Sequence, residues 1–352
     1  MKHPRPAAIA AVVAAPAALA VAFAWAGGWI GPKRLGGGAI ADALEYNGGS
    51  HPGYRRAHAK GLCFTGVFEA NGAGASLSRA AVFEAGSYPV FGRFSTAGGD
   101  PFATDGRNVF HAMALQITSP EGEIWRLAMD HTPIFPVATP QAFVELQRAS
   151  RPDPATGKPD PAVMKDYLSR HPETKAYQDY IAAAPLPDSF ANGTYYSINA
   201  FRFIDSAGEA RAVRWSFEPE TPLTVLDKQR LKEVPTDHLF DDMRERLTHG
   251  PVRWRMKIVV AAPGDPKSDA TIAWPSDRRT VETGVLRIDR AGPEEAGLCR
   301  DVTFDPTILP AGIGLSDDPL LPARSAAYSS SFRRRAVETP GPSAVGKSLG
   351  AH

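Results

Sequence analysis

Two spacings in the sequence place reactive side chains where they could act together. Arg324 precedes Tyr328 by four residues, one turn of a helix, so its guanidinium can face the tyrosine oxygen and favour the charged form. Alone, this spacing is more typical of an exposed Arg–Tyr pair on an amphipathic helix. His58 lies in a short basic block that leads directly into a predicted strand. It is a candidate general base, because imidazole exchanges protons near neutral pH.

Four blocks, in order along the chain, extend this pattern. They are RRAHAKG at 55–61, GRFST at 92–96, DHTPIF at 130–135, and FDP at 304–306 followed by PARSAAY at 322–328. In identity, order and separation these blocks resemble the haem catalases. The resemblance runs from about Ala41 to about Arg335. Because the chain is short for a catalase and begins with an apolar leader, it looks most like the catalase-related peroxidases, truncated members of that superfamily.

The resemblance implies a haem b cofactor and a role for each candidate residue. Tyr328 would be the axial ligand of the haem iron, as tyrosine is in catalases, with Arg324 beside it. His58 would be the general base on the opposite face, with a hydrogen bond to Ser95 that fixes its tautomer. The other cofactor-binding residues would be Arg55 and Arg93, at the haem propionates, and Phe135, in the haem wall.

One position departs from the family pattern. Catalases have an asparagine immediately before the Thr-Pro pair, where it donates a hydrogen bond to the peroxide, whereas this chain has His131. We therefore expect His131 to be a second catalytic imidazole, and its closeness to His58 would lower the pKa of at least one of the two. The alternative is that His131 points away and that Asp130, or water, faces the iron.

The function expected from these residues is a haem peroxidase that reduces hydrogen or organic peroxides with a small organic electron donor. One alternative keeps the haem but makes the enzyme chiefly a catalase, which dismutates hydrogen peroxide. An alternative from another class is a non-enzymatic carrier of haem or of an apolar ligand, since an antiparallel barrel of about eight strands can hold one ligand. The pair of His58 and Ser95, opposite a helix with Tyr328 and Arg324, argues against a carrier, because binding a ligand without chemistry does not need such a pair.

The composition excludes several other classes of protein. The chain has 352 residues, and Lys+Arg 39 against Asp+Glu 38 gives a formal net charge of +1. It therefore lacks the basic surplus that binding a nucleic acid needs. Two cysteines, Cys63 and Cys299, are too few for a disulfide framework or a four-cysteine metal site. Nothing in the sequence indicates the oligomeric state.

Residues 1–34 have the pattern of an export segment. Lys2 and Arg5 precede an uncharged run, rich in Ala and Val, that ends at Pro32, and Ala24-Trp25-Ala26 offers a small-x-small cleavage site. The run also reaches the roughly 20 residues that span a bilayer. We therefore expect an exported, periplasmic protein whose first 34 residues are either a cleaved signal peptide or an anchor in the inner membrane.

The rest of the chain predicts one α+β domain at 35–338, followed by a polar, disordered tail at 339–352. Hairpin connections dominate, so the sheet should be antiparallel. With the family resemblance, this predicts a catalase-like β-barrel of about eight strands with flanking helices. The strands are expected at 61–70, 81–96, 111–117, 124–129, 195–204, 212–217, 254–261 and 284–288. Helices should begin at Thr139-Pro140, Asp160-Pro161, His238 and Asp318-Pro319, and the glycines at 36–38 should form a linker.

Overall fold

The computed structural model describes residues 14, 16–24, 35–107, 110–227 and 229–345. The chain divides into two compact units, Met1–Gly36 and Gly37–His352. In the first unit residues 16–24 are helical, and most of the predicted export segment lies outside the described residues. Within the parts of the chain that the structure describes, no helix is both long enough and apolar enough to cross a membrane.

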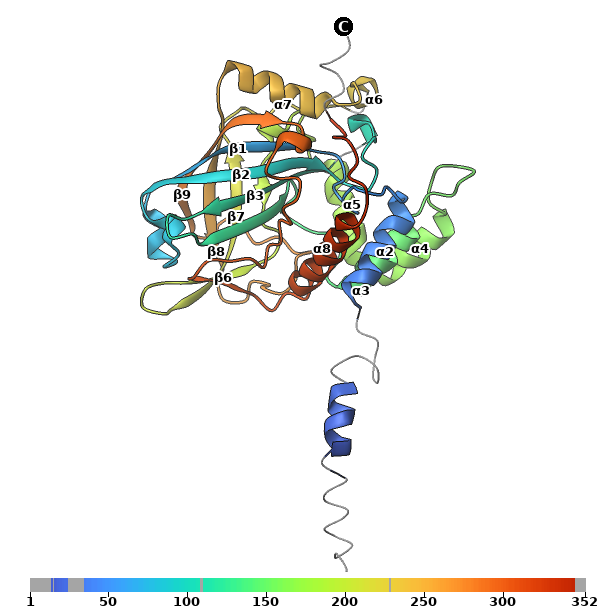
Figure 1. The fold of residues 1–352 in the computed structure, drawn as a ribbon, viewed down its shortest axis with the longest axis horizontal. Coiled ribbons are helices and arrows are strands. Elements are labelled where there is room, and N and C mark those ends of the chain that lie inside the picture. The colour runs from blue at the N-terminus through green and yellow to red at the C-terminus, as the bar shows by residue number, and fades with distance from the viewer. Residues whose placement is uncertain (1–13, 15, 25–34, 108–109, 228, 346–352) are drawn as a thin grey trace, which may run out of the picture. The chain divides into compact units, whose positions relative to one another are not determined.

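The second unit is built on a closed antiparallel barrel (Figure 1). Its eight strands follow the order β1-β2-β3-β4-β5-β7-β8-β9, and pairing of β7 with β8 closes the ring. The short strands β6 and β10 continue the sheet beside β7. The strands are β1 (Gly61–Ala70), β2 (Gly86–Thr96), β3 (His111–Thr118), β4 (Ile124–Asp130), β5 (Tyr195–Tyr196), β6 (Phe201–Ile204), β7 (Ala210–Pro219), β8 (Val252–Val260), β9 (Thr280–Gly292) and β10 (Ile313–Leu315). The predicted α+β class and barrel of about eight strands are confirmed.

The interior of the barrel is packed with large apolar side chains. Side chains alternate between the two faces of a strand, so every second residue points inward. Phe94, Met113 and Leu127 on three neighbouring strands are fully buried in this way, together with the indole rings of Trp125 and Trp254. A ligand held inside the barrel, which the carrier alternative assumed, would have to displace this core.

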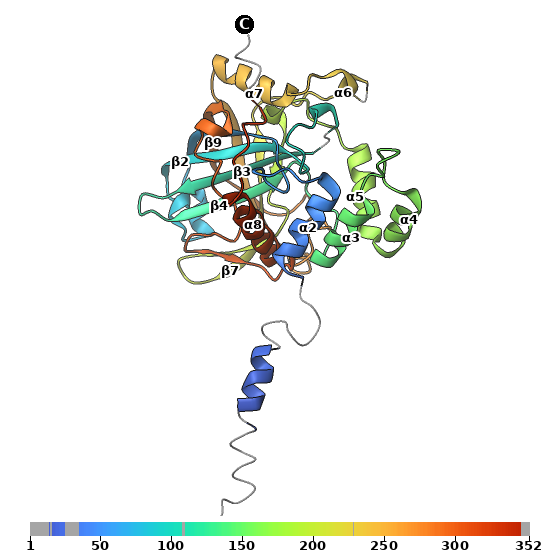
Figure 2. The same ribbon diagram turned by 45° about the vertical axis from the view of Figure 1, so that its right-hand side comes forward.

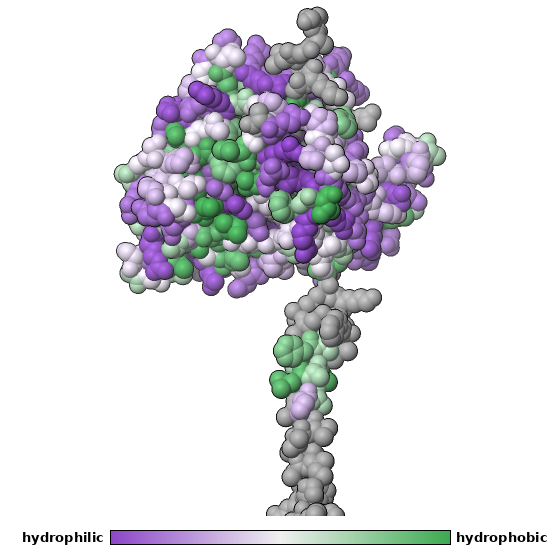
Figure 3. Space-filling view, in the orientation of Figure 1, coloured by the Kyte–Doolittle hydropathy of each residue, from purple (hydrophilic) through white to green (hydrophobic). Residues whose placement is uncertain are grey.

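Most of the helices gather on one side of the barrel, and two more lie across one end of it (Figure 2). They are α2 (Gly37–Gly48), α3 (Pro140–Ala149), α4 (Pro161–Arg170), α5 (Pro172–Ala183), α6 (Arg230–Glu233), α7 (His238–His249) and α8 (Leu320–Ala336). The predicted caps are present, since the side chains of Thr139 and Asp160 accept hydrogen bonds from the backbone N–H groups of Ala142 and Ala162. On the face seen in Figure 3, hydrophobic residues gather over the strands, whereas the surface around α8 is mainly hydrophilic.

Helix α2 was not predicted, because its first residues were read as a linker. Gly37 begins this helix and lies so close to α8 that an added Cβ would come within 2.0 Å of the Ala326 carbonyl oxygen. The absence of a side chain at Gly37 therefore allows α2 to pack closely against α8. Helix α2 also contacts α3, which makes it one wall of the region between α8 and α3.

Further segments differ from the sequence predictions. Residues 195–204 form two short strands, β5 and β6, instead of one, and α5 was not predicted. Residues 81–83 form a 3-10 turn before β2 instead of extending that strand. The start of the tail packs onto the body, since the Tyr54 hydroxyl donates a hydrogen bond of 2.8 Å to the Pro342 carbonyl and Val345 is buried in the barrel core. The disorder predicted for residues 339–345 is therefore wrong, and residues 346–352 lie outside the described residues.

The two cysteines form a disulfide bond between β1 and the segment that follows β9. Cys63 and Cys299 are 236 residues apart in the sequence. Their sulfur atoms lie in a small apolar cluster with Phe304, beside the outer face of β2 and β3. The low cysteine count correctly excluded a framework of several disulfides, but it gave no reason to expect this single bond.

Candidate active site

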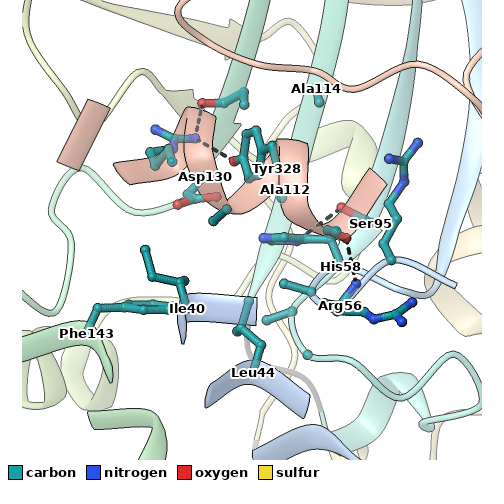
Figure 4. Close-up of a pocket in the computed structure, with 18 of the residues that line it drawn as sticks. Ile40, Leu44, Arg56, His58, Ser95, Ala112, Ala114, Asp130, Phe143 and Tyr328 are labelled. Carbon is teal, nitrogen blue, oxygen red and sulfur yellow. Dashed lines mark hydrogen bonds between the residues drawn. The ribbon is translucent and has the colours of Figure 1, made fainter. Parts of the chain in front are cut away.

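A cavity of about 540 Å³ lies between the outer face of β2, β3 and β4 and the helices α2, α3 and α8 (Figure 4). Its floor consists of residues that strand pairing places side by side. In one row, Ser95 pairs with Ala112, which pairs with Asp130. In the next row, two residues away along each strand, Arg93 pairs with Ala114, which pairs with Ala128. Because these residues alternate with the core residues, they face outward. The alanines keep the floor low, and this leaves space for a flat molecule.

His58 reaches the cavity from the segment before β1, beside the row of Ser95. Its Nδ1 atom and the Ser95 hydroxyl oxygen are 3.3 Å apart, and its ring also bonds the Thr96 backbone. The Ser95 contact is made by Nδ1 and so does not occupy Nε2. Burial, together with the positive charges of Arg93 and Arg324, lowers the pKa of His58 to about 4, so the imidazole is uncharged at neutral pH.

The backbone of His58 is in the left-handed region, with φ of 55°. For a residue other than glycine this costs about 1–3 kcal/mol and is found mainly at functional sites. The surrounding structure therefore holds His58 in an unfavourable conformation, and that conformation directs its ring toward the cavity.

Tyr328 and Arg324 project into the cavity from α8. The Arg324 guanidinium donates hydrogen bonds to the Tyr328 hydroxyl oxygen (3.2 Å), the Ala128 carbonyl (3.2 Å) and the Asn199 side-chain oxygen (2.6 Å). Asn199 in turn donates to Asp318, at 2.8 Å. Although burial opposes it, the charges of Tyr328, Asp130 and Asp318 raise the pKa of Arg324, which therefore stays charged beside the tyrosine.

A cluster of arginines occupies another edge of the cavity. Arg93 pairs with Glu294 at 2.6 Å, and Arg55 donates to the carbonyl oxygens of three residues, Cys299, Arg300 and Val302. Arg335, which the sequence reasoning missed, also lines the cavity and donates to the Arg300 carbonyl. Burial, with the charges of Arg93 and Arg335, lowers the pKa of Arg55 to about 9. Among the described residues, Arg93 is the one member of this cluster that forms an ion pair, whereas Arg55 and Arg335 feel the charges of Glu294 and Asp301 without forming one.

This arginine cluster fits the carboxylates of haem. The Nε atoms of Arg55 and Arg335 are buried and have no hydrogen-bond partner among the described residues. Two propionates would supply both the missing acceptors and the missing negative charge. Apolar walls from Ile40, Leu44, Phe135 and Phe143 would enclose the rest of the ring system. The residues present therefore suit a haem, with Tyr328 as the side chain that can bind its iron.

The structure does not bring His131 into the cavity. Asp130 is the last residue of β4 and faces the cavity like Ala128, whereas His131, the next residue, points elsewhere and is absent from the described lining. Its Nδ1 accepts a hydrogen bond from the His111 backbone N–H, at 3.1 Å. Of the two arrangements that the sequence left open, the geometry is thus that of Asp130 facing the cavity. The reason is the alternation of side chains along a strand.

The expected lowering of a histidine pKa is present, but its cause differs. Burial lowers the pKa of His131 to about 4, as it does for His58. Repulsion between these two imidazoles is not among the causes for either residue. Arg93, Ser95, Arg55, Arg324, Phe135 and Tyr328 all line the same cavity as His58, as the sequence comparison implied.

Comparison with known proteins identifies the family. The catalase family model matches residues 46–339. The chain is 38% identical over 296 residues to a catalase-related peroxidase of Synechococcus elongatus, covering 84% of this chain and 87% of that protein. It is 32% identical to a catalase-related peroxidase of Mycolicibacterium paratuberculosis, covering 84% and 93% respectively.

Solved structures show the same fold. A bacterial catalase matches with a TM-score of 0.72 at 22% identity, and a fungal catalase with 0.73 at 21%. Each match covers 87% of this chain but only 62% and 64% of the respective catalase, so this chain spans less than two thirds of their length. With the barrel, the cavity and the family match together, this chain belongs to the catalase family.

Proposed function

We propose that this protein is a haem b-dependent peroxidase that reduces hydrogen or organic peroxides with a small organic electron donor. The observation that carries the proposal is one cavity with His58–Ser95 on one side, Arg324–Tyr328 on another and the arginine cluster at its edge. The two relatives named as catalase-related peroxidases support it over a chiefly catalatic reaction.

The residues of the cavity have separate tasks in this proposal. When bound, haem supplies the iron at which peroxide is reduced and the donor's electrons are taken up. Tyr328 binds the iron through its deprotonated oxygen, which the charge of Arg324 stabilises. Arg55, Arg93 and Arg335 hold the propionates through charge-assisted hydrogen bonds.

His58 handles the proton of the peroxide. Its uncharged Nε2 would accept the proton from one peroxide oxygen and return it to the other, which would then leave as water or an alcohol, while the haem would supply the two electrons that break the O–O bond. The Ser95 contact holds the ring in the orientation that this transfer needs. Transfer of the proton within one small cavity avoids releasing a strongly basic leaving group.

We propose that the protein is exported to the periplasm. The leader pattern of residues 1–34 supports this, as either a signal peptide or an inner-membrane anchor. The Cys63–Cys299 disulfide also supports it, because such bonds persist in oxidising compartments and are rare in the cytosol.

The decisive experiment uses the purified, haem-loaded protein with hydrogen peroxide and an organic hydroperoxide. Donor oxidation is followed by absorbance and oxygen release by electrode on the same haem basis. Donor oxidation that exceeds oxygen release is the expected result. Oxygen release without donor oxidation would replace the peroxidase proposal with a catalase, and a haem spectrum that peroxide does not change would replace it with a carrier.

A further inference from the structure

The Cys63–Cys299 disulfide lies beside the arginine cluster at the edge of the cavity. Cys63 on β1 is the strand partner of Arg93 on β2. Residues directly opposite each other in an antiparallel pair have their side chains on the same face, with Cβ atoms about 4.5–5.5 Å apart. The disulfide therefore stands on the outer face of the barrel, next to one of the three arginines that line the cavity edge.

The stretch 294–302, which contains Cys299, supplies partners for all three arginines. The side chain of its first residue forms the ion pair with Arg93. The carbonyl oxygens of residues 299, 300 and 302 accept hydrogen bonds of 2.8–3.0 Å from Arg55, and that of residue 300 also accepts one of 2.6 Å from Arg335. The positions of the guanidiniums therefore depend on where this stretch lies.

The stretch 294–302 has little secondary structure of its own. It begins with a 3-10 turn, Glu294–Ala296, and residues 298–303 belong to no helix or strand. The disulfide joins it covalently to β1, which is paired with β2 on one side and with β9 on the other. Phe304, which lines the cavity, packs against both cysteines. The bond thus connects a firmly paired strand to the irregular stretch that carries the hydrogen-bond acceptors.

The charges within the arginine cluster oppose its assembly. After burial, the charges of Arg93 and Arg335 are the largest causes that lower the pKa of Arg55, because like charges repel. The carbonyl oxygens of the stretch 294–302 hold the guanidiniums without adding negative charge, so the cluster can still attract two carboxylates. If the stretch moved away, repulsion would separate the guanidiniums, and the propionates would lose aligned donors.

We propose that the Cys63–Cys299 disulfide is a positioning element for haem: it fixes the stretch 294–302, and through it the arginines that hold the propionates. This inference rests on the proposed function, because it takes haem as the occupant of the cavity. Opening the bond consumes two electrons and two protons, which a dithiol supplies as it becomes a disulfide itself, and yields two cysteine thiols. Haem is then retained tightly in an oxidising compartment, where such bonds persist, and released more readily in a reducing one.

The test measures how fast haem leaves the holoprotein, by its transfer to an excess of apomyoglobin followed by absorbance. Oxidised wild type is compared with wild type that has been reduced with dithiothreitol and freed of the reductant under argon, and with Cys63→Ala/Cys299→Ala. Titration of thiols confirms the reduction. The double variant treated with dithiothreitol is the control for the reductant, because the chain has no other cysteines.

Haem should leave the reduced protein and the double variant about tenfold faster than the oxidised wild type, because hydrogen bonds between charged groups are strong. The reductant should not change the rate of the double variant. Equal rates in the oxidised and reduced wild type would overturn the proposal, even if the double variant does not fold. Circular dichroism accompanies each measurement, and unfolding of the reduced protein would overturn the proposal too, since the bond would then hold the whole barrel.

A second set of variants separates positioning from general stability. Arg55→Ala/Arg335→Ala removes two of the guanidiniums that the stretch positions, so opening the disulfide in this variant should speed haem loss by less than about twofold. Arg333→Ala, an exposed arginine on the same helix as Arg335, is the matched control and should keep the full response. A full response in Arg55→Ala/Arg335→Ala would show that the disulfide does not act through these arginines.

Donor oxidation by the oxidised protein is recorded in parallel. If no donor is oxidised but the rates of haem loss differ as expected, the peroxidase proposal fails while the role of the disulfide stands. Equal rates of haem loss with normal donor oxidation would overturn the role of the disulfide alone.

Discussion

The two sides of the cavity are built differently. Tyr328 is held by Arg324, which also bonds Ala128 and Asn199, and Asn199 is fixed by Asp318. On the other side, His58 has a 3.3 Å contact with Ser95 and a strained backbone. Asp130 lies across from it, and its carboxyl forms no hydrogen bond or salt bridge with any residue that the structure describes. The comparison teaches that hydrogen bonds are saturated around the side chain that would bind the iron and left open where a substrate must exchange protons.

Removing the tyrosine oxygen should have the largest effect, because the saturated side then loses its ligand atom. Tyr328→Phe should abolish stable haem binding or shift the ferric absorption spectrum away from that of a phenolate-ligated haem. Haem content and the spectrum of the purified variant provide the measurement. Tyr46→Phe, at an exposed position on α2, is the control. A wild-type spectrum in Tyr328→Phe would disprove the assignment.

Removing the base on the open side should slow chemistry without losing the cofactor. His58→Ala should keep its haem and react with peroxide about 10²–10⁴-fold more slowly, because a positioned base is lost. Stopped-flow absorbance measures this rate, with His249→Ala at the exposed end of α7 as the control. A rate within a few-fold of wild type would assign the base role to another residue.

Weakening the saturated side without removing the ligand should have a smaller effect. In Arg324→Ala the tyrosine oxygen loses its charged neighbour, so protons compete more successfully with iron for that oxygen. Haem retention should then fall as the pH is lowered from neutral, whereas wild type keeps its haem. Arg333→Ala on the same helix is the control. Retention in Arg324→Ala that does not change with pH would show that the pairing has no such role.

The smallest effect is expected at His131, which lies outside the contrast between the two sides. Because Asp130 and not His131 lines the cavity, His131→Asn should leave the ratio of oxygen release to donor oxidation unchanged within about twofold. Both activities are measured on the same haem basis, alongside Asp130→Asn. A clear rise of the ratio in His131→Asn would restore His131 to the reaction.

Much of the fold could be predicted from local signals. Proline after Thr139 and after Asp160 marked two helix starts, and turn residues separated most of the strands. Helix α2 was missed because its glycines suggest flexibility, whereas contact with α8 requires one of them. Arg335 was missed as well, although it lies seven residues after Tyr328 and so about two turns farther along the same helix.

The sequence by itself determined which chemical groups are available: a histidine, a tyrosine with an arginine one turn before it, and further arginines in blocks whose order matches the catalase family. Only the tertiary structure decided which of two adjacent residues, Asp130 or His131, faces the cavity, since that depends on where β4 ends and on the side to which each residue then points. It likewise decided the pairing of Cys63 with Cys299 and the packing of Val345, because such contacts join parts of the chain that are close only after the barrel has closed.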